Sequence, residues 1–169
     1  MASGSTDTVD RLRRYAALSP RRGSGDTSVM AEESTYPDFV ERWRRAAAVT
    51  SPSDIDAVDR AVSIFDPDVV WESRAGTFEG AATVRGFLEE WWGNFQEGTN
   101  TVVEARDLGN GVMCAAHRLD GRPAGSERLV QERLGYTVVW AQGLVVRVIV
   151  HADIDEARAA AERLAEDRG

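Results

Sequence analysis

The chain has 169 residues, a formal net charge of −8 and one cysteine, Cys114. The negative charge opposes binding to nucleic acid phosphates and to anionic membrane surfaces, and a single cysteine excludes an internal disulfide. With neither a long apolar stretch nor a signal-peptide pattern, we expect a cytoplasmic protein with no nucleic acid and no membrane as partner.

The first residues of the chain are poor in apolar side chains. Residues 1–34 include the runs "MASGSTDTVD" and "SPRRGSGDTS". Such a segment cannot offset the entropy cost of ordering by burying apolar surface. We therefore predict a disordered extension over residues 1–34 and one folded domain over residues 35–169, with Met30 as an alternative start of translation.

Two helices are predicted next. The first covers residues 37–49, with Pro37 at its first position and Phe39, Val40, Trp43 and Ala47 on one face. The second follows Ser53, a candidate N-cap, in "SPSDIDAVDRAVSIF" and extends to Asp66. It should end before Pro67, because the residue preceding a proline is disfavoured in a helix. The following run "DVVWESR" is typical of a short strand.

A third helix is predicted after Gly80. Its apolar side chains recur at helical spacing and form a wide stripe: Val84, Phe87, Leu88, Trp91, Trp92 and Phe95. Four strand-like runs follow, "NTVVEARDL", "GVMCAAHRL", "LVQERLGYTVVW" and "LVVRVIVHA", separated by turn signals. A last helix is predicted over residues 153–165. This order predicts an α+β fold with a mostly antiparallel sheet.

Three segments carry a resemblance to a known family. They are "FDPDVVWE", "GTFEGAATVRGFLEEW" and "VVWAQGLVVRVIVHADIDEA", and the likeness extends over about residues 37–164. The chain resembles the nuclear transport factor 2-like superfamily, and within it the SnoaL-like group. The resemblance implies a curved sheet wrapped around helices as a cone-shaped α+β barrel, with a small-molecule cavity inside. It identifies a fold rather than an activity, because this scaffold hosts isomerases, cyclases, hydrolases and binding domains.

The same resemblance gives the aromatic side chains a role as cavity walls. Candidate pocket residues are Trp43, Trp71, Ser73, Phe87, Trp91, Gln131 and Arg133. Packing in an ordinary core is the alternative for the tryptophans, Trp92 above all. Ser73 stands where ketosteroid-isomerase-like members hold a catalytic aspartate, and a serine hydroxyl without a partner is not a base near neutral pH.

Four residues are candidates for acid/base chemistry. Arg118 and Asp120 match the Arg-x-Asp pair of limonene-epoxide-hydrolase-like members, although Val150 stands where those members have a second aspartate. His117 and His151 could transfer protons near neutral pH. A simple pairing of the last hairpin puts His151 on the face of Tyr136, and a shift of one residue would reverse this. The two histidines have no third ligand, so we expect no metal site and no cofactor.

Three functions are compatible with these residues. The first is an acid/base enzyme of isomerase, cyclase or hydrolase type acting on a hydrophobic small molecule. The second is a non-catalytic domain that binds such a molecule, and the third is a dimeric interaction module. A homodimer is predicted on the outer sheet face, because the simple pairing places Tyr136, Val138, Trp140 and Val145 there as exposed apolar side chains.

Overall fold

The structure is a computed structural model that describes residues 38–169. The predicted extension over residues 1–34, and Pro37 at the predicted helix start, lie outside the described residues. The helices are α2 (Phe39–Ala47), α3 (Ala57–Val62), α4 (Ala81–Gly93) and α5 (Ile154–Asp167). The strands are β1 (Phe65–Ser73), β2 (Gly76–Glu79), β3 (Phe95–Gly109), β4 (Val112–Pro123), β5 (Val130–Ala141) and β6 (Leu144–His151).

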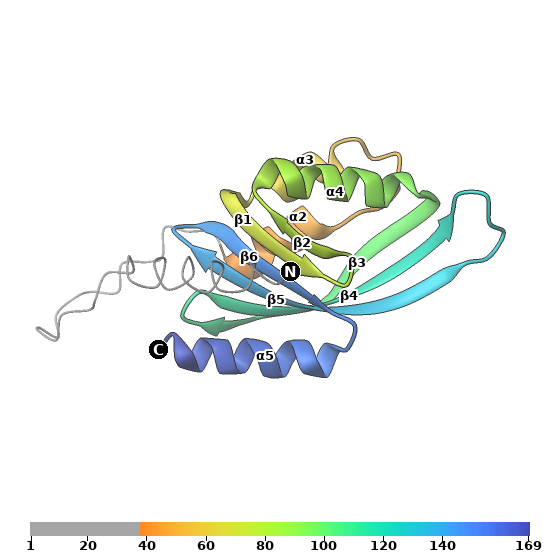
Figure 1. The fold of residues 1–169 in the computed structure, drawn as a ribbon. Coiled ribbons are helices and arrows are strands. Elements are labelled where there is room, and N and C mark those ends of the chain that lie inside the picture. The colour runs from red at the N-terminus through yellow and green to blue at the C-terminus, as the bar shows by residue number, and fades with distance from the viewer. Residues whose placement is uncertain (1–37) are drawn as a thin grey trace, which may run out of the picture. The chain divides into compact units, whose positions relative to one another are not determined.

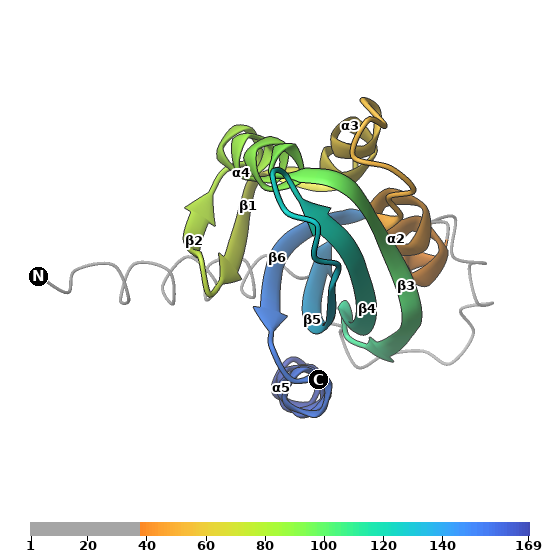
Figure 2. The ribbon, with the colours of Figure 1, turned by 90° about the vertical axis from the view of Figure 1, so that its right-hand side faces the viewer.

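The six strands form one curved, unclosed sheet in the order β2-β1-β6-β5-β4-β3. Only β1 and β6 pair in parallel, and the other neighbours are antiparallel. Figures 1 and 2 show α2, α3 and α4 over the concave face of this sheet, with α5 against the opposite, convex face. The predicted α+β class is confirmed. Within the described part, no helix has the length and apolar character needed to cross a membrane.

The segment before β1 differs from its prediction. Residues 51–56 form turns, because the side chains of Ser51 and Asp54 accept hydrogen bonds from the backbone N–H groups two residues ahead. The helix therefore begins only at Ala57. It ends before Phe65, which pairs with Val145 as the first residue of β1.

The structure also differs from the prediction on both sides of Gly80. The bend before it contains a short strand, β2, which pairs back onto β1. Gly80 itself has a φ of 90° and caps α4, a conformation that side-chain-bearing residues rarely adopt. Helix α4 ends at Gly93, so Phe95 opens β3 rather than closing the helix.

A bulge in the last hairpin decides which side chains face inward. Trp140 pairs with Val145, but the next pair is Val139 with Arg147, so β6 contains one extra residue. Tyr136 consequently pairs with Val150, whereas a hairpin without the bulge would pair it with Ile149. Side chains alternate between the two faces of a strand. The one-residue shift therefore moves every later side chain of β6 to the face opposite the expected one.

The side chains that were predicted on the outer face of the sheet therefore point inward. Tyr136, Val138, Trp140 and Val145 are all buried in the main core, with Phe39 of α2 stacked on Trp140. The apolar surface from which the homodimer was inferred is thus absent, and that reasoning was wrong.

Helix α5 packs closely on the convex face. A second core cluster between this helix and β4 contains Val112, Cys114, Ala161 and Ala165. Gly135 of β5 lies so near to α5 that a Cβ atom at this position would be 2.5 Å from the Cβ of Ala157. Glycine is required here by the close approach of two backbones.

Candidate functional site: an aromatic cavity

The concave face of the sheet and the three helices above it border a partly open cavity of about 500 Å³. This volume lies within the range of small-molecule sites in proteins. Seven aromatic side chains line it: Trp43, Phe65, Trp71, Phe87, Trp91, Trp92 and Tyr136. Four of them come from β1 and α4, between residues 71 and 92, which explains why so short a segment carries so much aromatic surface.

Five of the predicted pocket residues line this cavity. Trp43 comes from α2, Trp71 and Ser73 from β1, and Phe87 and Trp91 from α4. Trp92 also lines it, and both tryptophans of α4 are half-buried rather than enclosed in the core. Ser73 is engaged locally, since its Oγ accepts a hydrogen bond from the backbone N–H of Ala75.

His117 of β4 is 1 % exposed and lines the cavity. Trp43 donates a hydrogen bond from Nε1 to its Nε2 at 2.9 Å. Its Nδ1 lies 3.1 Å from Nδ2 of the Asn100 amide, and Tyr136 stacks on the ring with centroids 4.0 Å apart. Burial, assisted by the nearby positive charge of Arg44, lowers the pKa of His117 to about 3. The imidazole is therefore neutral near pH 7, and both of its nitrogens face protein groups.

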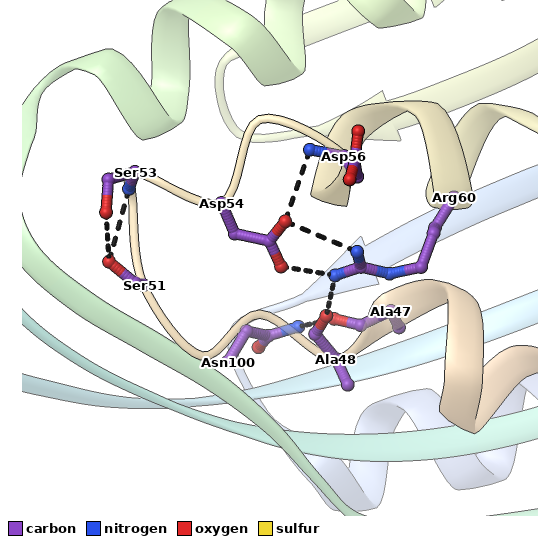
Figure 3. A network of polar contacts seen from close by, with 8 residues as sticks. All are labelled: Ala47, Ala48, Ser51, Ser53, Asp54, Asp56, Arg60 and Asn100. Atoms are coloured by element: carbon purple, nitrogen blue, oxygen red, sulfur yellow. Dashed lines mark hydrogen bonds and ion pairs between the residues drawn. The ribbon is translucent and has the colours of Figure 1, made fainter.

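Asn100 of β3 connects this site to the chain segment between α2 and α3. Its Nδ2 donates to the carbonyl oxygen of Ala47 at 2.8 Å, and its backbone exchanges two hydrogen bonds with Val49. Figure 3 shows Arg60 beside it, donating to the carbonyl oxygen of Ala48 at 3.3 Å and to the Asp54 carboxylate at 2.6 Å. These contacts fix the end of α2 and the following loop against the cavity wall.

The cavity interior is uncharged. Among the described residues that line it, only Arg74 and Glu132 carry charge, and both are exposed at its edge. Burial raises the pKa of Tyr136, so its phenol keeps its proton near neutral pH. A charged ligand would be desolvated here without an opposite charge to compensate, which is costly. The lining therefore favours a neutral, mainly apolar molecule.

Four of the other predicted residues lie on the convex face. Arg118 pairs with Arg133 and Asp120 with Gln131 across β4 and β5. Arg118 and Asp120 form an ion pair of 2.8 Å with each other, and none of the four lines the cavity. Their strand neighbours Glu132 and Leu134 do, because alternate residues of a strand point to opposite faces.

His151 also lies away from the cavity. It pairs with Gly135, and its Nε2 is 3.1 Å from Oγ1 of Thr137, which in turn donates to the carbonyl oxygen of Ala157 in α5. Burial lowers its pKa. The bulge in β6 places Val150, not His151, in the cavity wall.

Sequence reasoning did not identify Asn100 and Tyr136 as cavity residues. Asn100 had a recognisable signal, because an amide side chain is uncommon in a strand and usually has a specific partner. Tyr136 had none, since its direction depends on the bulge. No group of three potential metal ligands occurs within residues 38–169.

Comparison with known proteins agrees with this architecture. The model of the SnoaL-like domain matches residues 39–160. A search of curated proteins finds no match. Among solved structures, a hypothetical protein from Catenulispora acidiphila with a ketosteroid isomerase-like fold, in complex with trimethylamine, is similar with a TM-score of 0.57 and 15 % identity. The alignment covers 75 % of this chain and 94 % of that one.

Two proposed polyketide cyclases are also similar. The protein from Sinorhizobium meliloti has a TM-score of 0.53 and 18 % identity, over 68 % of this chain and 94 % of that chain. The SnoaL-like protein from Jannaschia has a TM-score of 0.51 and 16 % identity, over 66 % and 82 % respectively. At such identities these structures establish a shared fold alone. The family match over most of the folded region shows that this chain belongs to the SnoaL-like domain family.

Proposed function

We propose that this protein binds a neutral, predominantly apolar small molecule in the cavity between its sheet and helices, and that binding rather than proton transfer is its function. The observation that carries the proposal is the cavity of about 500 Å³ with its seven aromatic walls and uncharged interior. Flat rings of a ligand can stack on such walls, and the gain scales with the apolar area removed from water.

The state of His117 favours binding over acid/base catalysis. A general base must offer a lone pair to its substrate and have a pKa near the working pH. His117 is held by Trp43 and Asn100, and its pKa is about 3. The other candidates, Arg118, Asp120 and His151, are not cavity-lining residues. A homodimer is not part of this proposal, because its apolar contact surface is buried within the chain.

Binding can be tested with N-phenyl-1-naphthylamine, a neutral aromatic amine whose fluorescence rises in apolar surroundings. We expect saturable binding with one site per chain. Two variants should block it: Ala61→Phe, which fills the cavity from α3, and Ala75→Trp, which places an indole at an exposed lining position. Ala159→Phe on α5 is the matched control, since Ala159 does not line the cavity.

Two results would overturn the proposal. One is a parent protein that shows no saturable fluorescence change. The other is unaltered binding in both folded blocking variants, which would place the probe elsewhere on the protein. Circular dichroism of each variant establishes that it is folded.

A further inference from the structure

Two glycines lie directly opposite each other on β3 and β4. Gly98 pairs with Gly121, and two residues along each strand Asn100 pairs with Leu119. The latter two residues both line the cavity. Because alternate residues of a strand share a face, a side chain at either glycine would also point to the concave face. We call Gly98 and Gly121 the glycine pair.

Backbone conformation does not require glycine at either position. Neither Gly98 nor Gly121 has a positive φ, unlike Gly80. A glycine inside a strand weakens the strand, because it has no side chain to pack and loses more conformational freedom on folding than other residues. Glycine at these two positions therefore indicates that another group approaches the backbone closely.

Aromatic rings occupy the space that the missing side chains leave. A Cβ atom at Gly98 would be 3.1 Å from Cζ3 of Trp92, and one at Gly121 would be 2.7 Å from Cδ1 of Phe95. Phe95 in turn packs on both tryptophans at the end of α4, with ring centroids 5.7 Å from Trp91 and 5.8 Å from Trp92. The glycine pair thus lets this aromatic group lie against the backbone of the sheet.

The position of Trp92 determines how much space is open at this end of the cavity. Trp91 and Trp92 both line the cavity, and both are half-buried. A side chain at Gly98 would push the indole of Trp92 away from the strand. Cγ of Pro52 and the carbonyl oxygen of Asp120 each lie 3.6 Å from the same Cβ position, so the indole cannot move into their place. The open space beside the indole is the cavity.

We propose that the glycine pair positions Trp91 and Trp92 and thereby sets the size of the ligand that the cavity accepts. This inference rests on the proposed function and adds a size limit to it. Neither glycine needs to touch the ligand, because each acts through the aromatic ring that lies against it. A larger side chain at Gly98 should therefore exclude large ligands, while small ones still bind.

Two probes that differ by one ring test this size limit. N-phenyl-1-naphthylamine carries a phenyl group that 1-naphthylamine lacks, and both are neutral and fluorescent. We expect the parent protein to bind the larger probe more tightly, because it buries more apolar surface. In Gly98→Val, the affinity for the larger probe should fall about tenfold, whereas the affinity for the smaller one should change less than about threefold. Gly121→Ala should act in the same direction, because it displaces the ring of Phe95.

A second substitution shows whether Gly98 acts through Trp92. In Trp92→Leu the indole is absent, so adding Gly98→Val should weaken binding of the larger probe by less than about twofold. Gly98→Ala adds only one methyl group and should weaken binding of the larger probe by about threefold. This milder variant carries the test if Gly98→Val does not fold, as judged by circular dichroism.

Gly93→Ala is the matched control. Gly93 directly follows Trp92 in the chain, but a Cβ atom there would have no neighbour within 4 Å. Both probes should therefore bind this variant with the affinities of the parent protein.

The outcomes separate the two proposals. If neither probe binds the parent protein saturably, the proposed function fails. If both bind and the folded Gly98 and Gly121 variants keep the preference of the parent for the larger probe, the binding function stands and the role of the glycine pair is refuted. An equal loss of affinity with and without the indole of Trp92 would also refute it, because Gly98 would then act through another group.

Discussion

His117 shows how its surroundings remove the reactivity of a buried histidine. The neutral ring accepts a hydrogen bond from Trp43, lies against the amide of Asn100 and stacks on Tyr136. A proton added to it would be desolvated and close to the positive charge of Arg44. The residue thus supports the cavity wall, and the uncharged state of that wall depends on it.

This depressed pKa predicts that acid destabilises the fold. The unfolded chain binds a proton at His117 below about pH 6.5, whereas the folded chain does so only near pH 3. Stability from this group is complete above pH 6.5 and declines as the pH falls toward 3, by roughly 1.4 kcal/mol per pH unit. Between pH 6.5 and about pH 4 the loss is about 3 kcal/mol. Urea denaturation across this range measures it.

His117→Gln is the variant that isolates this effect. Its stability should vary less with pH over the same range, because no imidazole at this position remains to be protonated on unfolding. His151→Gln serves as a comparison, since the pKa of His151 is also lowered by burial. Parallel pH profiles for the parent and His117→Gln would contradict the assignment of a buried neutral His117.

Elements whose residues share one clear spacing could be predicted from the sequence. The stripe of α4, the strands β3 to β6 and the last helix follow directly from 3.6-residue and two-residue periods. The cavity-lining roles of Trp43, Trp71 and Phe87 were expected from the family resemblance, and each is found in the cavity wall.

Which side chains of β5 and β6 face the cavity could not be predicted. One extra residue at the bulge moves Tyr136 and Val150 into the cavity and excludes Gln131, Arg133 and His151. The bulge lies in the run LVVRVIVH, which contains neither a glycine nor a proline that would mark it in the sequence. The same event changed an expected dimer surface into core.

The contact of β5 with α5 makes a prediction at Gly135. Gly135→Ala would place two Cβ atoms 2.5 Å apart, one on the strand and one on the helix, so the two backbones would have to move apart. We expect the free energy of unfolding to fall by roughly 1–3 kcal/mol. Gly86→Ala is the control, because Gly86 lies in α4 with open space around it and should gain about 0.5–1 kcal/mol. Thermal denaturation compares the two, and equal effects would contradict the close packing of α5.

The tryptophans that line the cavity should differ in how much each contributes to the stability of the fold. Trp43 is 2 % exposed and satisfies His117, so Trp43→Ala should cost about 3–5 kcal/mol. Trp91 and Trp92 are half-buried beside an existing cavity, so truncating either should cost clearly less, roughly 1–2 kcal/mol. Urea denaturation of the three variants tests this order. A Trp91→Ala variant as unstable as Trp43→Ala would mean that the space beside Trp91 is not open.

At the scale of the molecule, residues 38–169 contain a main core cluster and a smaller one under α5. The main cluster joins α2, α4 and strands β1, β4, β5 and β6, and its members all lie between residues 39 and 150. We therefore propose that residues 35–169 form the folded domain. Deleting residues 1–34 should change the melting temperature by no more than a few degrees. A larger fall would show that the deleted residues contribute to the core.

We expect a neutral apolar molecule to occupy the space between the sheet and the helices. A crystal structure of the full chain grown with fluorenone shows whether it does. We predict one molecule of this flat, neutral three-ring ketone among Trp71, Phe87, Trp91 and Tyr136. A structure in which protein side chains fill this space, or in which fluorenone lies only on the outer surface, would contradict the claim.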